Sequence, residues 1–159
     1  MTMTHDQIPT AVGRQGWTLR LHEGELVFAG LPAGSDMPAL AKDARPLSSI
    51  AWHEGETSVL APCDVVPDGV EKFGPWRAFE VEGQIDFLLT GVLHGIISPL
   101  AAGQIAVTTV STYRTDWILV PSEQTAQAVN VWRYHGYAVR VDEPGSQDTP
   151  DVDGAEELA

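Results

Sequence analysis

The sequence predicts an α+β fold, in which antiparallel sheets carry helices on one face. Three observations support this prediction. Most segments alternate polar and apolar residues as half-buried strands do, two segments have helical spacing, and the elements between Trp76 and Val141 follow in the order βαββαβ. This order is the ferredoxin-like arrangement. The first half of the chain looks like an abbreviated unit of the same kind, without a clear second helix.

Four strands are expected in the first half of the chain, separated by segments rich in glycine and proline. Their ranges are 17–22, 25–31, 47–53 and 56–62. Glu23-Gly24 predicts a tight turn, so the first two strands should form a hairpin. Residues 33–46 are expected to be a loop with at most a short helix, and residues 63–75 a connector.

The second half is more regular, with four strands and two helices. The strand ranges are 76–82, 104–112, 115–121 and 137–141. A helix is expected over 91–103, because its apolar residues have helical spacing. Thr90 is its expected N-cap, and Gly103 should end it.

A second helix is expected over 122–136. Ser122, which follows Pro121, should cap it. Its apolar face should carry Ala126, Val129 and either Trp132 or Arg133.

Composition and pattern divide the chain into four parts. Residues 1–15 are a mobile N-terminus, 16–74 an N-terminal unit, 75–142 a C-terminal unit, and 143–159 an acidic disordered tail. The tail holds six Asp and Glu residues and no Lys or Arg, so it carries nearly half of the net charge of −13.

The charge balance excludes several classes of function. No basic stripe could neutralise phosphates, so nucleic acid and anionic membrane are not expected partners. No apolar stretch is long enough to span a bilayer. The single Cys63 rules out an intrachain disulfide and fits a reducing compartment, so a cytoplasmic location is expected.

Catalysis is not expected either. The five histidines are scattered without metal-ligand spacing, Cys63 has no neighbouring base, and no glycine-rich phosphate loop occurs. The sequence therefore predicts no enzyme, no metal and no cofactor.

The run TGVLHGIISPLAAGQIAV resembles the first helix and second strand of ACT domains, the ligand-binding modules attached to enzymes of amino-acid metabolism. The shared pattern is a glycine at the strand-to-helix turn, then Val-Leu, Ile, a small-residue break and Ile-x-Val. In this chain these residues are Gly91, Val92, Leu93, Ile96, Gly103, Ile105 and Val107.

Together with STYRTDWILV, the pattern is similar to the tandem-ACT group that includes CASTOR-type amino-acid sensors and the ACT pairs of aspartate kinases. Small bacterial members of that group are similar from about Trp17 to about Val141. Two departures are Thr90, where many ACT domains have proline, and SIAWHEGE, where small members usually show a Thr-rich turn. Both departures bear on ligand identity more than on fold.

The resemblance implies a free amino acid bound between the two units. The candidate ligand-binding residues are Ser58, Val59, Thr90, Gly91, Val92, Leu93, His94, Thr115 and Asp116. Unpaired amides at the helix start suit the ligand carboxylate, and Gly91 allows close approach. Asp116 suits the ammonium group, and His94 is the candidate for side-chain specificity.

Alternatives remain open for each residue and for the function. Asp116 could instead cap the Tyr113-Arg114 turn, Ser58 could lie on an exposed strand face, and His94 could be an ordinary surface residue. The whole protein is either an amino-acid sensor that acts on an unknown protein partner, or an interaction module that has lost its ligand. The resemblance implies a homodimer; a monomer with its two units paired internally is the alternative.

Overall fold

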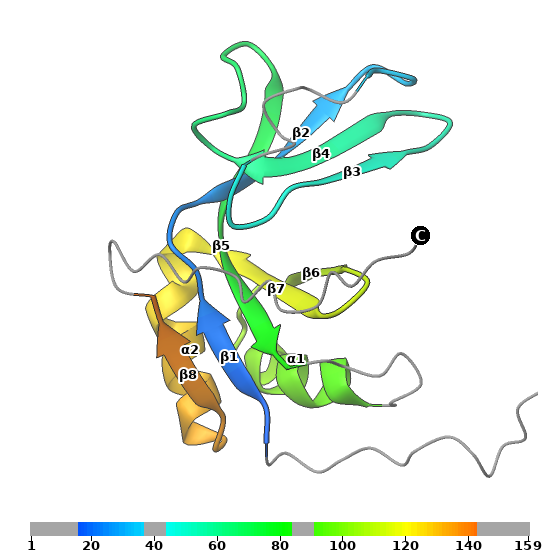
Figure 1. Ribbon diagram of the computed structural model, residues 1–159. Helices are drawn as coiled ribbons and strands as arrows, with labels where there is room; N and C mark the ends of the chain where they lie inside the picture. The colour runs from blue at the N-terminus through cyan, green and yellow to red at the C-terminus, as the bar shows by residue number, and fades with distance from the viewer. Residues whose placement is uncertain (1–15, 37–43, 84–90, 143–159) are drawn as a thin grey trace, which may run out of the picture.

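The computed structural model describes residues 16–36, 44–83 and 91–142, and confirms the predicted α+β class (Figure 1). The elements are β1 (Thr18–Leu21), β2 (Leu26–Leu31), β3 (Ser49–Trp52), β4 (Thr57–Pro62), β5 (Glu71–Glu82), α1 (Val92–Ala102), β6 (Thr108–Ser111), β7 (Asp116–Pro121), the 3-10 turn η3 (Ser122–Gln124), α2 (Thr125–Tyr134) and β8 (Ala138–Val141). The N-terminus, the tail, residues 37–43 and Thr90 lie outside the described residues.

The long strand β5 joins two lobes. Its first part pairs with β2, and β4 and β3 follow in the order β3-β4-β2-β5. Its second part pairs with β7 on one side and β1 on the other, in the order β6-β7-β5-β1-β8. We call residues 23–75 the N-terminal lobe, and the other described residues the C-terminal lobe. Figure 1 shows the N-terminal lobe above the C-terminal lobe.

The predicted hairpin at Glu23-Gly24 is wrong. β1 and β2 do not pair with each other; both run antiparallel to β5, with Leu21 opposite Phe79 and Leu26 opposite Trp76. The intervening residues bulge out of one long interrupted strand, and the φ of 86° at Gly24 accommodates the bend. A Glu-Gly pair favours a tight bend, but it does not specify which strand becomes the partner.

This pairing carries the first half of the chain into the second. β1 lies between β5 and β8, and it runs parallel to β8, the one parallel pair among the described strands. The division at residues 74 and 75 stays a prediction, and the sheet is continuous across it.

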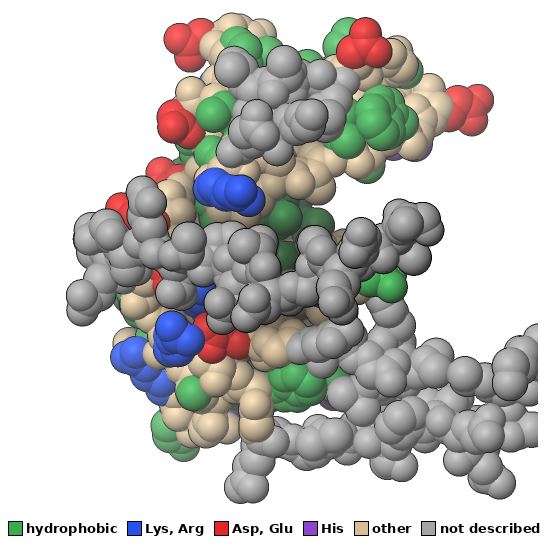
Figure 2. All heavy atoms as spheres, in the orientation of Figure 1, with side chains coloured by type: hydrophobic (Ala, Val, Ile, Leu, Met, Phe, Trp, Pro, Cys, Tyr) green, Lys and Arg blue, Asp and Glu red, His purple; other side chains and the backbone are tan. Residues whose placement is uncertain are grey.

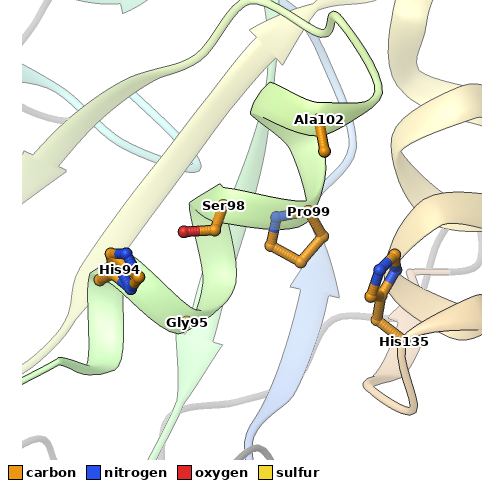
Figure 3. Close-up of a pocket in the computed structure, with 6 residues that line it drawn as sticks. All are labelled: His94, Gly95, Ser98, Pro99, Ala102 and His135. Carbon is orange, nitrogen blue, oxygen red and sulfur yellow. The ribbon is translucent and has the colours of Figure 1, made fainter.

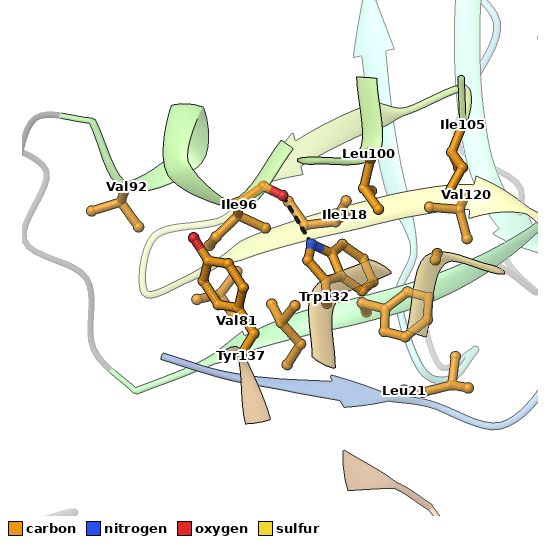
Figure 4. Packing of buried hydrophobic residues seen from close by; sticks show 13 residues of the cluster. Leu21, Val81, Val92, Ile96, Leu100, Ile105, Ile118, Val120, Trp132 and Tyr137 are labelled. Carbon is orange, nitrogen blue, oxygen red and sulfur yellow. Dashed lines mark hydrogen bonds between the residues drawn. The ribbon is translucent and has the colours of Figure 1, made fainter. Parts of the chain in front are cut away.

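Both helices cover one face of the C-terminal lobe. Buried apolar residues of α1, α2, β1, β5 and β7 form the largest core cluster (Figure 4), and Val139 of β8 packs against it. At its centre, the Trp132 indole donates to the Ile96 carbonyl at 2.8 Å and meets the Phe79 ring edge-on at 4.7 Å. The opposite, helix-free face packs against the N-terminal lobe through a second cluster that contains Leu26, Leu60, Trp76, Trp117 and Leu119.

The predicted start of the second helix is wrong, whereas Gly103 ends α1 as expected. Ser122 begins η3, and its hydroxyl makes no capping bond; α2 starts at Thr125. Of the expected apolar face, Trp132 is buried and Val129 packs against the core, whereas Ala126 and Arg133 are exposed and Ala128 is buried instead.

Candidate functional site

The start of α1 has no side-chain cap among the residues that the structure describes. Gly91 is the N-cap, with φ 81° in the left-handed region that glycine tolerates. The first turn of the helix holds no acidic residue. The amide groups of Val92, Leu93 and His94 therefore lack helical partners and can accept an anion.

Asp116 lies at the first position of β7. The Ser111 hydroxyl, directly across the β6–β7 pair, donates to Asp116 Oδ1 at 2.5 Å. Within the described part of the chain, Oδ2 accepts no hydrogen bond, and Arg114 forms no ion pair with this carboxylate. The adjacent turn is closed by Thr112 and Thr115 instead. One of the two carboxylate oxygens of Asp116 thus has a hydrogen-bond partner in the paired strand β6.

Thr115 has a structural contact. Its hydroxyl donates to the Val81 carbonyl, and its carbonyl accepts from the Thr112 amide at 2.9 Å. These bonds tie the start of β7 to the end of β5. The position of Asp116 is fixed as a result.

Strand alternation determines which candidate residues face the same way. Trp117 belongs to the cluster between the lobes, and Ile118 belongs to the helix-side core. Asp116 therefore shares the helix-bearing face with Ile118. The end of β5 pairs with the start of β7, and α1 follows β5 in the chain, so Asp116 and Gly91 lie at the same end of the same layer.

Ser58 and Val59 point to opposite faces of β4. Val59 is buried in a third apolar cluster, on the outer face of the N-terminal lobe. Ser58 shares its face with Leu60, which packs between the lobes. The register thus directs Ser58 to the face between the lobes, and directs Asp116 to the opposite face of the sheet of the C-terminal lobe.

His94 lines a groove between the two helices (Figure 3). The groove has a volume of about 290 Å³, and its lining is His94, Gly95, Ser98, Pro99, Ala102 and His135. His135 Nδ1 donates to the Val131 carbonyl at 2.9 Å. A Cβ at Gly95 would lie 3.3 Å from the Tyr137 hydroxyl, so the close packing of Tyr137 explains this glycine inside a helix.

The sequence did not reveal a polar network on the helix-free face. His22 Nε2 lies 2.7 Å from Glu80 and its Nδ1 lies 3.4 Å from Asp142, while Arg20 pairs with Asp142 at 2.8 Å. The His22 ring also stacks on Trp117 at 4.8 Å. The partners come from β1, β5, β7 and the end of β8, so no local motif marks them.

Two further features of the described residues concern metal ligands and the Cys63 thiol. In the described ranges, no three His, Cys, Asp or Glu side chains are grouped to hold a metal ion. Burial raises the pKa of the Cys63 thiol, and the charges of Glu25 and Asp64 add to the effect, so the reactive thiolate is disfavoured. No helix in the described part of the chain is long and apolar enough to cross a membrane.

Three solved structures share this fold. A protein from Agobacterium tumefaciens is 28% identical, with a TM-score of 0.74 over 80% of this chain and 94% of that one. A protein of unknown function from Vibrio cholerae is 16% identical, with a TM-score of 0.63 over 76% and 91%. The ligand-free regulatory subunit of aspartate kinase from Thermus thermophilus is 11% identical, with a TM-score of 0.51 over 73% and 95%.

Sequence comparison finds a family match over part of the chain. Residues 74–133 match the family model of the ACT domain. Domains of this family generally bind small molecules and have a regulatory role. A search of curated proteins finds no match. The matched range begins inside β5 and ends within α2, and it contains the start of α1 and Asp116. Residues 74–133 thus match an ACT domain, and the chain shares its fold with the regulatory subunit of aspartate kinase.

Proposed function

We propose that the protein is a non-catalytic amino-acid sensor, of the kind that the resemblance to CASTOR-type proteins implies. The ligand zwitterion places its carboxylate on the amides of Val92, Leu93 and His94, and its ammonium group on Asp116. The single observation that carries this proposal is the common position of Gly91 and Asp116, at one end of the helix-bearing layer. Opposite charges at one site match the two ends of an amino acid.

The second carboxylate oxygen of Asp116 is the acceptor for the ligand ammonium group. Oδ1 of Asp116 is bonded to Ser111, but Oδ2 is left for a ligand among the described residues. A charge-assisted bond from an ammonium group would contribute about 1.5–3 kcal/mol. Thr115 supports the site by holding the strand start in place, and His94 would reach the ligand side chain.

A thermal shift screen against the twenty amino acids tests the proposal. A ligand at 100 times its Kd adds about 2.7 kcal/mol to the free energy of unfolding. We expect Asp116→Asn to abolish the shift while it leaves the melting temperature of the free protein nearly unchanged. Asp36→Asn, an exposed aspartate of the other lobe, is the control. A flat response to all twenty amino acids would overturn the sensor function.

One observation favours the alternative, an interaction module without a ligand. The Ser111 hydroxyl already gives Asp116 a partner inside the chain. Ser111→Ala separates the two functions: in a sensor, ligand binding survives or tightens because the carboxylate loses a competitor. In a ligand-free module, the same change only lowers stability.

The proposal extends to assembly and location. We propose a cytoplasmic homodimer that transmits the bound state to a protein partner. The single cysteine fits a reducing compartment, and side-by-side pairing is what the family resemblance implies. Light scattering coupled to size exclusion, with and without ligand, measures the oligomeric state.

A further inference from the structure

The two lobes differ sharply in charge. In the described part of the N-terminal lobe eight carboxylates stand against two cations. The acids are Glu23, Glu25, Asp36, Glu54, Glu56, Asp64, Asp68 and Glu71; the cations are Arg45 and Lys72. The described C-terminal lobe has five acids and five arginines. Figure 2 shows Asp and Glu side chains around the outline of the N-terminal lobe, with hydrophobic side chains between them.

The outer face of this lobe also contains an apolar cavity. Its floor is Ala29, Val59 and Ala61 of β2 and β4, and the connector after β4 covers it with Val65, Val66 and Val70. We call these six residues the valine slot. The cavity measures about 30 Å³, room for the end of one aliphatic side chain.

The wall of the slot is held in place. The Lys72 ammonium donates to the Val66 carbonyl at 2.9 Å and lies 3.9 Å from Asp68. Asp64 and Asp68, both exposed, flank Val65 and Val66 in the connector. Carboxylates therefore border the apolar opening.

An exposed tryptophan extends the same face. Trp52 pairs with Thr57, whose side chain points to the same side of β4 as Val59. The Trp52 side chain is 58% exposed, and its indole is fixed by a 2.9 Å bond to the Ser35 carbonyl. The Thr57 hydroxyl is fully buried and has no hydrogen-bond partner within the described residues. A fixed aromatic ring beside an apolar slot is typical of a binding hot spot.

We propose that the valine slot and Trp52 form a docking surface for a basic protein segment that carries an aliphatic anchor. The anchor enters the slot, while flanking Lys or Arg side chains meet Asp64, Asp68 and the Trp52 ring. Charge selects this occupant. A second copy would bring two acidic lobes together, and the acidic tail of the chain would be repelled in the same way.

A peptide titration of the full chain, followed by amide NMR, tests the surface. The probe is a capped peptide with two central leucines flanked by arginine and lysine. One control peptide has serine in place of leucine, and a second has glutamate in place of the basic residues. We expect shifts confined to the slot and to Trp52, and only with the first peptide. Equal shifts with the serine peptide, shifts spread over both lobes, or no shifts would each overturn the proposal.

Substitutions in the chain complete the test. We expect Val66→Asp to weaken the affinity for the leucine probe peptide by about ten-fold or more. The double variant with Asp64→Asn and Asp68→Asn should weaken this affinity by about three-fold and make it less dependent on salt. Glu123→Gln, an exposed acid of the C-terminal lobe, should leave affinity unchanged. Unchanged affinity in both slot variants would refute the surface. A dimer that Val66→Asp dissociates would assign it to a second copy instead.

Discussion

At the scale of single residues, contacts distant in sequence decide what each polar side chain can do. Ser111 satisfies one of the carboxylate oxygens of Asp116 across the hairpin, although the two residues are five positions apart. The Tyr137 hydroxyl lies close to the place where a side chain at Gly95 would stand. Cys63 looked unreactive for lack of a base, and its surroundings add a second reason.

The raised pKa of Cys63 leads to a prediction about its reactivity. Burial and the charges of Glu25 and Asp64 disfavour the thiolate, so alkylation by iodoacetamide should reach half its maximal rate at a pH above the ordinary thiol value. Asp64→Asn removes one of the two repelling charges, so it should shift the profile to lower pH. Asp36→Asn should leave it in place. A profile centred below the ordinary value would contradict this environment.

At the scale of elements, most of the fold could be predicted, because the spacing of apolar residues that indicates a strand or a helix is contained within each segment. The eight strands and two helices that the structure describes follow the expected order, and Gly103 ends α1. β5 begins at Glu71, however, inside the segment 63–75 for which the sequence predicts a connector. The errors concern which strands pair and where α2 begins. Glu23-Gly24 marks a bend, but only the alignment of both flanking strands with β5 makes it a bulge.

Ser122 shows the same limit at a helix end. Its type and position fit an N-cap, but η3 occupies the first turn, α2 begins at Thr125, and Ala128 rather than Ala126 is buried. For the candidate site, the chain positions of Gly91 and Asp116 were readable from the sequence. The separate faces of Ser58 and Val59 follow from strand alternation alone. The partner of Asp116 and the His22 network depend on strand pairing and register, which one sequence does not contain.

The contact between the helices yields a prediction about stability. Trp132 is fully buried and donates to the Ile96 carbonyl in α1. Trp132→Phe removes this bond and leaves a small cavity, so the free energy of unfolding should fall by about 2 kcal/mol. Trp52→Phe, at an exposed indole, should cost less than about 0.5 kcal/mol in denaturant titrations. Equal costs would mean that the helices do not depend on this contact.

At the scale of the whole molecule, the lobes share a strand and a core. β5 pairs with strands of both lobes, and β1, from the first half of the chain, pairs in the C-terminal lobe. The second apolar cluster, which contains Leu26 and Trp117, packs the two lobes against each other. A lobe that unfolded alone would expose this cluster and break the β5 pairing of the other. The two lobes should therefore unfold as one cooperative unit.

Two matched cavity variants test this coupling. Leu60→Ala lies in the N-terminal lobe and Ile96→Ala in α1, and both side chains are almost completely buried. Each should lower the free energy of unfolding by about 2–5 kcal/mol and shift one common transition, seen alike by tryptophan fluorescence and by circular dichroism. Two separated transitions, with each variant moving only one, would show that the shared strand does not couple the lobes. Coupling of this kind is also what would let a ligand at the start of α1 alter the stability of the valine slot, because both depend on β5.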